Sequence, residues 1–155
     1  MTVDAPTLSY GTLDSSGNKV DPSSGGIASV STGSTLSGYL DDGDTLWFSV
    51  LVTAGNLGTN QDFGFALGTD PMINLGRVPL SNNGNGLGFE IYKTDLWTGL
   101  WVDGAGNTRS GSKGGVVAGT TYLVVGEMIF GATDTINIYL PDAALNQGSV
   151  VASNT

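Results

Sequence analysis

Hydrophobic and polar residues alternate with a period of two in several short segments of this chain. Glycine or a cluster of turn residues interrupts the alternation about every 8–12 residues, which is the spacing of all-β domains. The clearest segment is 45–53, which follows an acidic turn. One face of the strand predicted there is hydrophobic throughout: Leu46, Phe48, Val50 and Val52. The opposite face carries Trp47, Ser49 and Leu51, and Trp47 is expected to have a structural role because it lies within this core strand.

Further strands are predicted at 62–68, 72–78, 86–92, 97–102, 120–130 and 134–140, with weaker ones at 7–10 and 26–30. The residues 81–86 favour positive φ and predict a hairpin between 72–78 and 86–92. The turn at 131–133 predicts a second hairpin, which ends at Pro141. The Gly- and Ser-rich stretch 103–115 is interpreted as a loop. The pattern predicts an all-β fold, a two-sheet antiparallel β-sandwich.

The length of 155 residues suits one domain over 1–155, long enough to bury about two-thirds of the surface of the unfolded chain. No tandem repeat divides it. Residues 1–11 lack the basic and apolar regions of a signal peptide, and no apolar run reaches the ~20 residues of a membrane-spanning helix. We therefore expect no membrane insertion. If the protein is exported, its signal peptide has been removed, and we expect the domain to be a fragment of a larger exported protein.

The segment from Tyr122 to Pro141, YLVVGEMIFGATDTINIYLP, resembles a strand–turn–strand signature of concanavalin A-like, laminin-G-like jelly-roll domains. These domains are common in bacterial exported surface proteins of the planctomycete and verrucomicrobial type. The segments 13–20 and 45–52 resemble the same group. The resemblance implies a jelly roll with an extracellular or cell-surface location. The chain departs from the group at Glu127, where the group has Lys or Arg. Such domains usually carry one more strand before residue 8 and one after residue 150, and their absence would expose a sheet edge.

Composition narrows the function classes. The chain has no cysteine and no histidine, which removes disulfides, thiolate metal sites and histidine-dependent acid–base or nucleophilic chemistry. Its formal net charge of −9 disfavours nucleic acid and anionic lipid surfaces. The only glutamates are Glu90 and Glu127, and the E-x-D-x-E strand motif of glycoside hydrolases of this fold is missing. We therefore expect no enzyme activity, and a glycoside hydrolase relic is the less favoured reading.

The predicted ligand site lies on the polar face of the strand pair at 86–102. Sugars present apolar CH faces and hydroxyl groups, so their sites combine aromatic rings with polar groups. Trp97 and Trp101 are four residues apart on one face, within about 14 Å, and would stack on sugar rings. Residues Tyr92, Glu90 and Asp95 would bond hydroxyl groups. The competing interpretation is that both tryptophans pack under the stretch 103–115.

Two acidic, glycine-bearing turns are candidate calcium sites, because Ca²⁺ prefers hard oxygen ligands. The candidate ligands are Asp41, Asp42 and Asp44 in the first turn, and Asp103 and Asn107 in the second. Neither turn has the EF-hand spacing, and turn-forming Asp is commoner than ligating Asp. The leading function is a non-catalytic, lectin-like domain that binds a polysaccharide or glycan. The alternative is a structural or adhesive surface domain that self-associates through its sheet edges.

Overall fold

The computed structural model describes residues 2–4, 9–14, 19–21, 41–53, 62–68, 86–92, 95–102 and 106–155. Within these residues the chain forms strands and turns, and no helix. The strands are β1 (Thr2–Asp4), β2 (Ser9–Tyr10), β3 (Leu13–Asp14), β4 (Lys19–Asp21), β5 (Thr45–Thr53), β6 (Asp62–Gly68), β7 (Gly86–Tyr92), β8 (Asp95–Val102), β9 (Gly106–Lys113), β10 (Thr121–Ile129), β11 (Thr135–Tyr139) and β12 (Val150–Asn154). The predicted all-β class is confirmed for this part of the chain.

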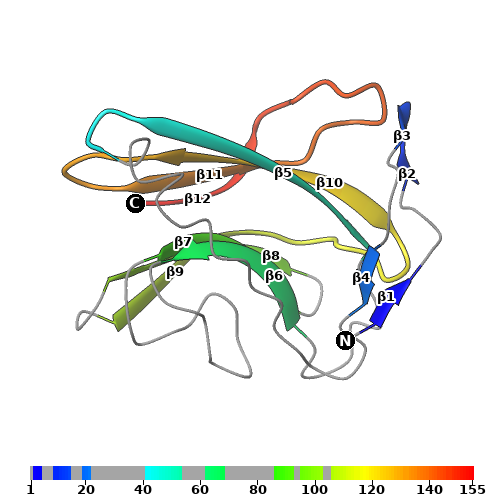
Figure 1. Cartoon of the computed structure of the whole chain (residues 1–155), viewed down its shortest axis with the longest axis horizontal. Coiled ribbons are helices and arrows are strands. Elements are labelled where there is room, and N and C mark those ends of the chain that lie inside the picture. Colours follow the sequence, from blue (N-terminus) through cyan, green and yellow to red (C-terminus); the bar gives the residue numbers. More distant parts are fainter. Residues whose placement is uncertain are drawn as a thin grey trace.

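Eight of the described strands form two four-stranded antiparallel sheets, which are drawn one above the other in Figure 1. The β5 sheet has the strand order β12-β11-β10-β5. The β7 sheet has the order β6-β7-β8-β9. Two short antiparallel pairs, β1 with β4 and β2 with β3, lie beside them. The hairpin predicted on either side of residues 131–133 is confirmed as β10 and β11, with Glu127 opposite Asn137.

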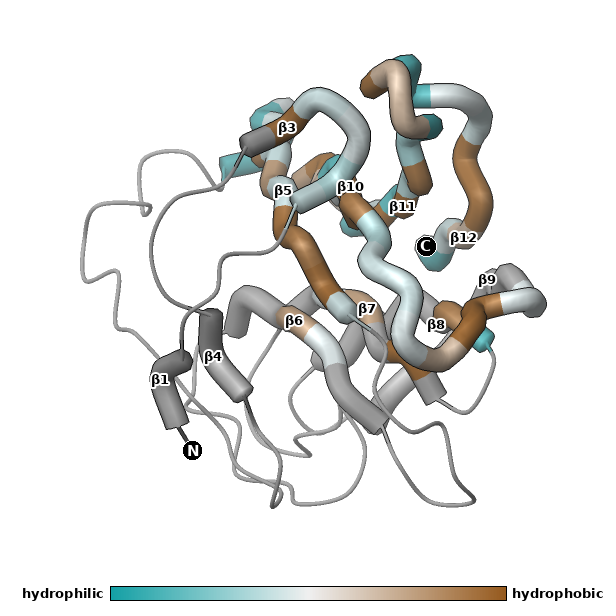
Figure 2. The backbone as a smooth tube through the Cα atoms, turned by 90° about the vertical axis from the view of Figure 1, so that its right-hand side faces the viewer, coloured by the Kyte–Doolittle hydropathy of each residue, from teal (hydrophilic) through white to brown (hydrophobic). Residues whose placement is uncertain are grey.

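One hydrophobic cluster contains residues of both sheets. Its members are Phe89, Ile91 and Leu96 from the β7 sheet, Val124, Met128, Ile136, Ile138 and Ala152 from the β5 sheet, and Val116 before β10. The predicted stripe of β5, Leu46, Phe48, Val50 and Val52, packs against this cluster. Alternation is visible on β11 in Figure 2, where hydrophobic residues are separated by hydrophilic ones. Each fully buried side chain of this kind stabilises the fold by about 2 kcal/mol.

Phe48 connects the two sheets through its ring. The ring centroid lies 4.8 Å from that of Phe65 on β6 and 6.2 Å from that of Phe89 on β7. Such aromatic pairs contribute roughly 0.5–1.5 kcal/mol beyond the area they bury. This cluster of three rings therefore holds β5 against β6 and β7.

The prediction that 103–115 is a loop was wrong for most of that stretch. Residues Gly106–Lys113 form β9, which pairs with β8 from Leu96 to Val102. Gly and Ser have low strand propensity, but a backbone ladder with an existing neighbour is available to any residue except proline. Between Trp97 and Thr98 the register of this pairing shifts, because β9 contains one extra residue at that point, as in a β-bulge.

The predicted hairpin between 72–78 and 86–92 is also wrong. The strand at 86–92, β7, pairs along its whole length with β6 on one side and β8 on the other. No edge of β7 remains for another strand. The segments 26–30, 72–78 and 81–85 themselves lie outside the described residues. Turn composition alone did not identify the partner, because the residues that favour a turn do not specify which strands it connects.

Strands occur near both ends of the chain. β1 pairs with β4, and β12 pairs with β11 at one edge of the β5 sheet. The possibility that the chain lacks strands before residue 8 and after residue 150 is thereby removed. Within the described residues, however, β1 and β12 are not neighbours in one sheet. β12 was not predicted because its sequence, Val-Val-Ala-Ser-Asn, has no strict alternation.

Candidate functional site

The face of the β5 sheet that points away from the hydrophobic cluster carries most of its polar side chains. Alternation along β5 directs Phe48 into the cluster and Trp47 to the other side. Trp47 is 49% exposed, which is unusual for a large apolar side chain. The expected structural role of Trp47 is therefore not supported by its exposure.

The register of the sheet places four residues of this outer face in one row across the strands. Trp47 on β5 is opposite Glu127 on β10, Glu127 is opposite Asn137 on β11, and Asn137 is opposite Ser153 on β12. Neighbouring side chains in such a row have Cβ atoms about 4.5–5.5 Å apart, close enough for direct contact. Trp47 and Glu127, which are 80 positions apart in the sequence (127 − 47), are thus brought side by side.

Hydrogen bonds connect the polar members of this row. The Ser153 hydroxyl donates to Oδ1 of Asn137 at 2.8 Å, and Nδ2 of Asn137 donates to Oε2 of Glu127 at 3.0 Å. The hydroxyl of Tyr139 donates to the same Oε2 atom at 2.9 Å. A carboxylate that accepts two such bonds is held in one orientation.

Tyr139 links the carboxylate to the exposed tryptophan. Its ring stacks on Trp47 with a centroid distance of 5.8 Å and an interplanar angle of 27°. Burial raises the pKa of the Tyr139 phenol, and the hydrogen bond to Glu127 and the negative charge of Glu127 raise it further. Tyr139 therefore remains a hydrogen-bond donor to Glu127 at neutral pH. We refer to Trp47, Glu127 and Tyr139 as the aromatic–carboxylate cluster.

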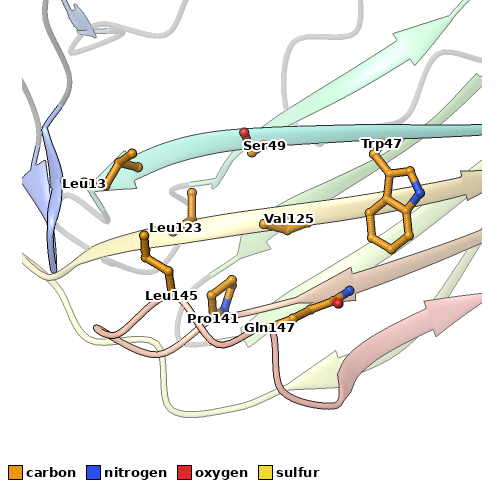
Figure 3. A pocket seen from close by; sticks show the side chains of 8 residues that line it. All are labelled: Leu13, Trp47, Ser49, Leu123, Val125, Pro141, Leu145 and Gln147. Atoms are coloured by element: carbon orange, nitrogen blue, oxygen red, sulfur yellow. The ribbon is translucent and has the colours of Figure 1, made fainter.

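A hollow of about 400 Å³ lies next to this cluster on the same face (Figure 3). Trp47 forms one wall of it, as the stick drawing shows. The other lining residues are mostly apolar: Leu13, Ser49, Leu123, Val125, Pro141, Leu145 and Gln147. Its volume falls within the range of small-molecule sites, which are about 300–1,000 Å³. The site thus combines an apolar surface with a line of hydrogen-bonding groups.

The loop after Pro141 forms one side of the hollow and is fixed by Asp142. The Asp142 carboxylate accepts hydrogen bonds from the backbone N–H groups of Ala144 and Asn146 at 2.9 and 3.0 Å, and from Nδ2 of Asn146. The side-chain hydrogen bond from Asn146 is the largest cause that lowers the pKa of Asp142. In this loop Leu145 adopts a φ of 67°. This backbone conformation is strained by about 1 kcal/mol for any residue that has a Cβ atom.

The β2–β3 hairpin lies against the same loop. The Tyr10 hydroxyl donates to the carbonyl oxygen of Pro141. In the turn, Gly11 has a φ of 55°, and a Cβ atom there would lie 2.0 Å from the carbonyl oxygen of Ala143. Only glycine fits this contact. The hairpin therefore brings Leu13 to the rim of the hollow from a part of the sequence where strand signals are weak.

The predicted ligand residues of 86–102 lie on β7 and β8 of the other sheet. The register places Glu90 opposite Trp97, Tyr92 opposite Asp95, and Gly86 opposite Trp101. The predicted strand pair is confirmed, and these positions alternate with the buried Phe89, Ile91 and Leu96. Asp95 is half-buried. The side chains of Trp97, Trp101, Tyr92 and Glu90 lie outside the described part of the structure.

The candidate calcium residues show a turn geometry. Oδ2 of Asp44 accepts a hydrogen bond from the N–H of Asp41 at 3.1 Å, and the N–H of Asp44 donates to the carbonyl of Asp41 at 2.9 Å. Asp42 is exposed. Asp103 lies outside the described residues, and for Asn107 only the backbone, in β9, is described. Among the described side chains, no group of three or more His, Cys, Asp or Glu residues is placed to hold a metal ion.

The two glutamates lie on different sheets, Glu90 on β7 and Glu127 on β10.

The described part of the chain contains no helix long and apolar enough to cross a membrane. A comparison of the chain with protein-family models, curated proteins and solved structures found no match. The geometry of the outer face is therefore the basis on which a function can be argued.

Sequence reasoning missed this face for an identifiable reason. The alternation on β11 does separate Asn137 and Tyr139 from the buried Ile136 and Ile138, and the alternation on β5 does separate Trp47 from Phe48. Each strand thus signals a polar face. The pairing of β5 with β10, which gathers these residues, has no local signal because more than 65 residues separate the two strands.

Proposed function

We propose that this chain is a non-catalytic, carbohydrate-binding, lectin-like domain of an extracellular or cell-surface protein. In this proposal the β5 and β7 sheets are the two layers of a concanavalin A-like jelly roll. One observation carries the function: the exposed Trp47 stacks on Tyr139 beside the hydrogen-bonded row of Glu127, Asn137 and Ser153. An aromatic ring accepts the apolar face of a sugar, and the row supplies partners for its hydroxyl groups.

The hollow supports this assignment by its position. It extends from Trp47 along β10 to the loop at Leu145, so a chain of sugar rings can leave the aromatic platform and continue over Leu123 and Val125. Gln147 adds an amide on the rim of this path. The lining residues Trp47, Ser49, Leu123 and Val125 belong to β5 and β10, which pair over their full length, so this part of the surface is formed before a ligand arrives. Such preorganisation reduces the entropic cost of binding.

The experiment is a glycan array followed by affinity electrophoresis with Trp47→Ala, Trp97→Ala and Trp101→Ala. We expect the wild type to be retarded by at least one polysaccharide, and Trp47→Ala to lose about tenfold or more in affinity because stacking contributes most of the contact. The Trp97 and Trp101 variants are matched controls, since each removes the same side chain from the other sheet. A loss confined to these two variants would place the glycan on the β7 sheet, as the sequence predicts. Absence of binding to every glycan would contradict the proposal.

Self-association is the second candidate function. In the described residues β5 and β12 each have one hydrogen-bonded neighbour and occupy the two edges of the β5 sheet. Edge strands of this kind can pair with another chain. Sedimentation velocity over a wide range of protein concentration tests this directly. A single monomeric species at all concentrations would exclude it, and mass that rises with concentration would support it.

A further inference from the structure

The positive charges of the chain are absent from the segments that build the β5 sheet. The five basic residues are Lys19, Arg77, Lys93, Arg109 and Lys113. The segments 41–53 and 114–155, which supply β5, β10, β11, β12 and their turns, contain none of these. They carry six carboxylates: Asp41, Asp42, Asp44, Glu127, Asp134 and Asp142. These segments therefore carry a net negative charge, which favours the approach of cations over that of anions.

Glu127 is the carboxylate that faces the candidate site. Its Oε2 atom accepts hydrogen bonds from Asn137 and Tyr139, and both donors are neutral groups. No basic residue lies on its own strand or on the two strands that flank it. A charged group that is oriented by neutral donors, half-buried and without a cationic neighbour on these strands is suited to pair with a cation on a ligand.

The aromatic rings beside Glu127 favour the same kind of ligand. Trp47 is directly opposite Glu127, and Tyr139 contacts both of them. An ammonium group is attracted by the face of a tryptophan or tyrosine ring, by about 0.5–2 kcal/mol depending on its exposure to water. A carboxylate next to these rings adds a direct charge interaction. The same cluster therefore offers an ammonium group two attractive contacts at once.

We propose that the aromatic–carboxylate cluster binds an ammonium group and that the glycan of this domain is an amino sugar with free amines, of the glucosamine class. This inference rests on the proposed carbohydrate-binding function and names its substrate class. The sugar ring lies on the apolar surface of the hollow, and its ammonium group lies between Glu127 and the Trp47 ring. Uronic acids and sulfated sugars are excluded by charge repulsion.

A divalent cation fits the cluster less well than an ammonium group. Calcium takes six to eight oxygen ligands, which include several carboxylates or carbonyl groups. The cluster has one carboxylate, and the described side chains show no group of three or more His, Cys, Asp or Glu residues that could hold a metal ion. An ammonium group, in contrast, needs one carboxylate and an aromatic surface, both of which are present.

The test compares two oligosaccharides of equal length by isothermal titration calorimetry. One is a glucosamine oligomer with free amines, and the other is the same oligomer with every nitrogen acetylated. At a pH where the amines are protonated, we expect the wild type to bind the free-amine oligomer about tenfold more tightly. Glu127→Gln should lower this preference to about twofold or less. Trp47→Ala should weaken the binding of both oligomers.

The matched control is Asp42→Asn, which removes one negative charge from an exposed position in the turn before β5. It should retain the preference for the free-amine oligomer. Added salt should reduce the preference of the wild type, because screening weakens the charge interaction, and this readout holds even where Glu127→Gln is unstable. Equal affinity for both oligomers, lost in Trp47→Ala, would overturn the ammonium proposal and leave carbohydrate binding intact. No binding of either oligomer, together with an empty glycan array, would overturn both.

Discussion

The ring of Phe48 lies against the backbone of Gly126, the residue opposite it on the neighbouring strand. A Cβ atom at residue 126 would lie 2.0 Å from the Phe48 ring. Both residues face the hydrophobic cluster, so the missing side chain of Gly126 provides the space that the ring of Phe48 occupies. This contact positions Phe48 to reach Phe65 and Phe89 on the other sheet.

Substitution of Gly126 should therefore destabilise the fold. We expect Gly126→Ala to lower the free energy of unfolding by about 1–3 kcal/mol, because the added methyl group forces the Phe48 ring out of its position. Urea denaturation measures the change. The double variant Gly126→Ala with Phe48→Leu should lose less than the sum of the two single variants, since the smaller side chain removes the clash. Strict additivity would contradict the contact.

The sequence predicts the individual strands of this molecule well, but it does not predict which strands that are distant in the sequence pair with each other. Phe48 and Gly126 each have a clear local signal, since one lies in an alternating strand and the other in a hairpin strand, and both strands were predicted nearly to the residue. Their pairing was not predictable, because many antiparallel arrangements satisfy the same alternation. The outer-face site depends on that pairing. The row from Trp47 to Ser153 could therefore be identified only from the strand register in the structure.

Two further elements show the same limit. β9 consists of Gly, Asn, Thr, Arg, Ser and Lys residues that do not signal a strand, and it forms because β8 offers a backbone edge. β3 is a two-residue strand whose place near the hollow is set by the contact of its hairpin with the loop at Pro141. Long, alternating strands are specified locally, whereas short or glycine-rich strands are specified by their neighbours.

Tyr139 should make the free energy of unfolding depend on pH in the alkaline range. Burial and the charge of Glu127 raise the pKa of its phenol above the ordinary value of 10.0. The unfolded chain then loses the phenolic proton at a lower pH than the folded chain, so the free energy of unfolding falls as pH rises above 10. We expect Tyr139→Phe to show a smaller fall than the wild type in urea denaturation between neutral pH and that range. Parallel curves for the two proteins would contradict the raised pKa of Tyr139 in the folded chain.

Asp142 should make the loop beside the hollow sensitive to acid. Hydrogen bonds from the Asn146 side chain and from backbone N–H groups lower the pKa of Asp142 below its ordinary value of 3.8. The stabilisation by the ionised form is present above pH 3.8 and is lost as pH falls through the lowered pKa. We expect Asp142→Asn to have a lower Tm than the wild type near neutral pH, and the difference to shrink in acid. A difference in Tm that is constant over this range would show that the carboxylate charge does not stabilise the loop.

Trp47 and Phe48 are adjacent aromatic residues, and we expect substitution of Trp47 to affect mainly binding and substitution of Phe48 to affect mainly stability. Phe48→Ala removes a ring that packs against the hydrophobic cluster and should cost about 3 kcal/mol in the free energy of unfolding. Trp47 is 49% exposed and loses mainly its stack on Tyr139, so Trp47→Ala should cost only about 1 kcal/mol. In contrast, Trp47→Ala should remove most of the glycan affinity, while Phe48→Leu, which keeps an apolar side chain, should retain it. The measurements are urea denaturation and affinity electrophoresis on the same protein preparations. An unstable Trp47→Ala, or a Phe48→Leu that is folded but does not bind, would contradict the assignment of the two faces of β5 to binding and to the core.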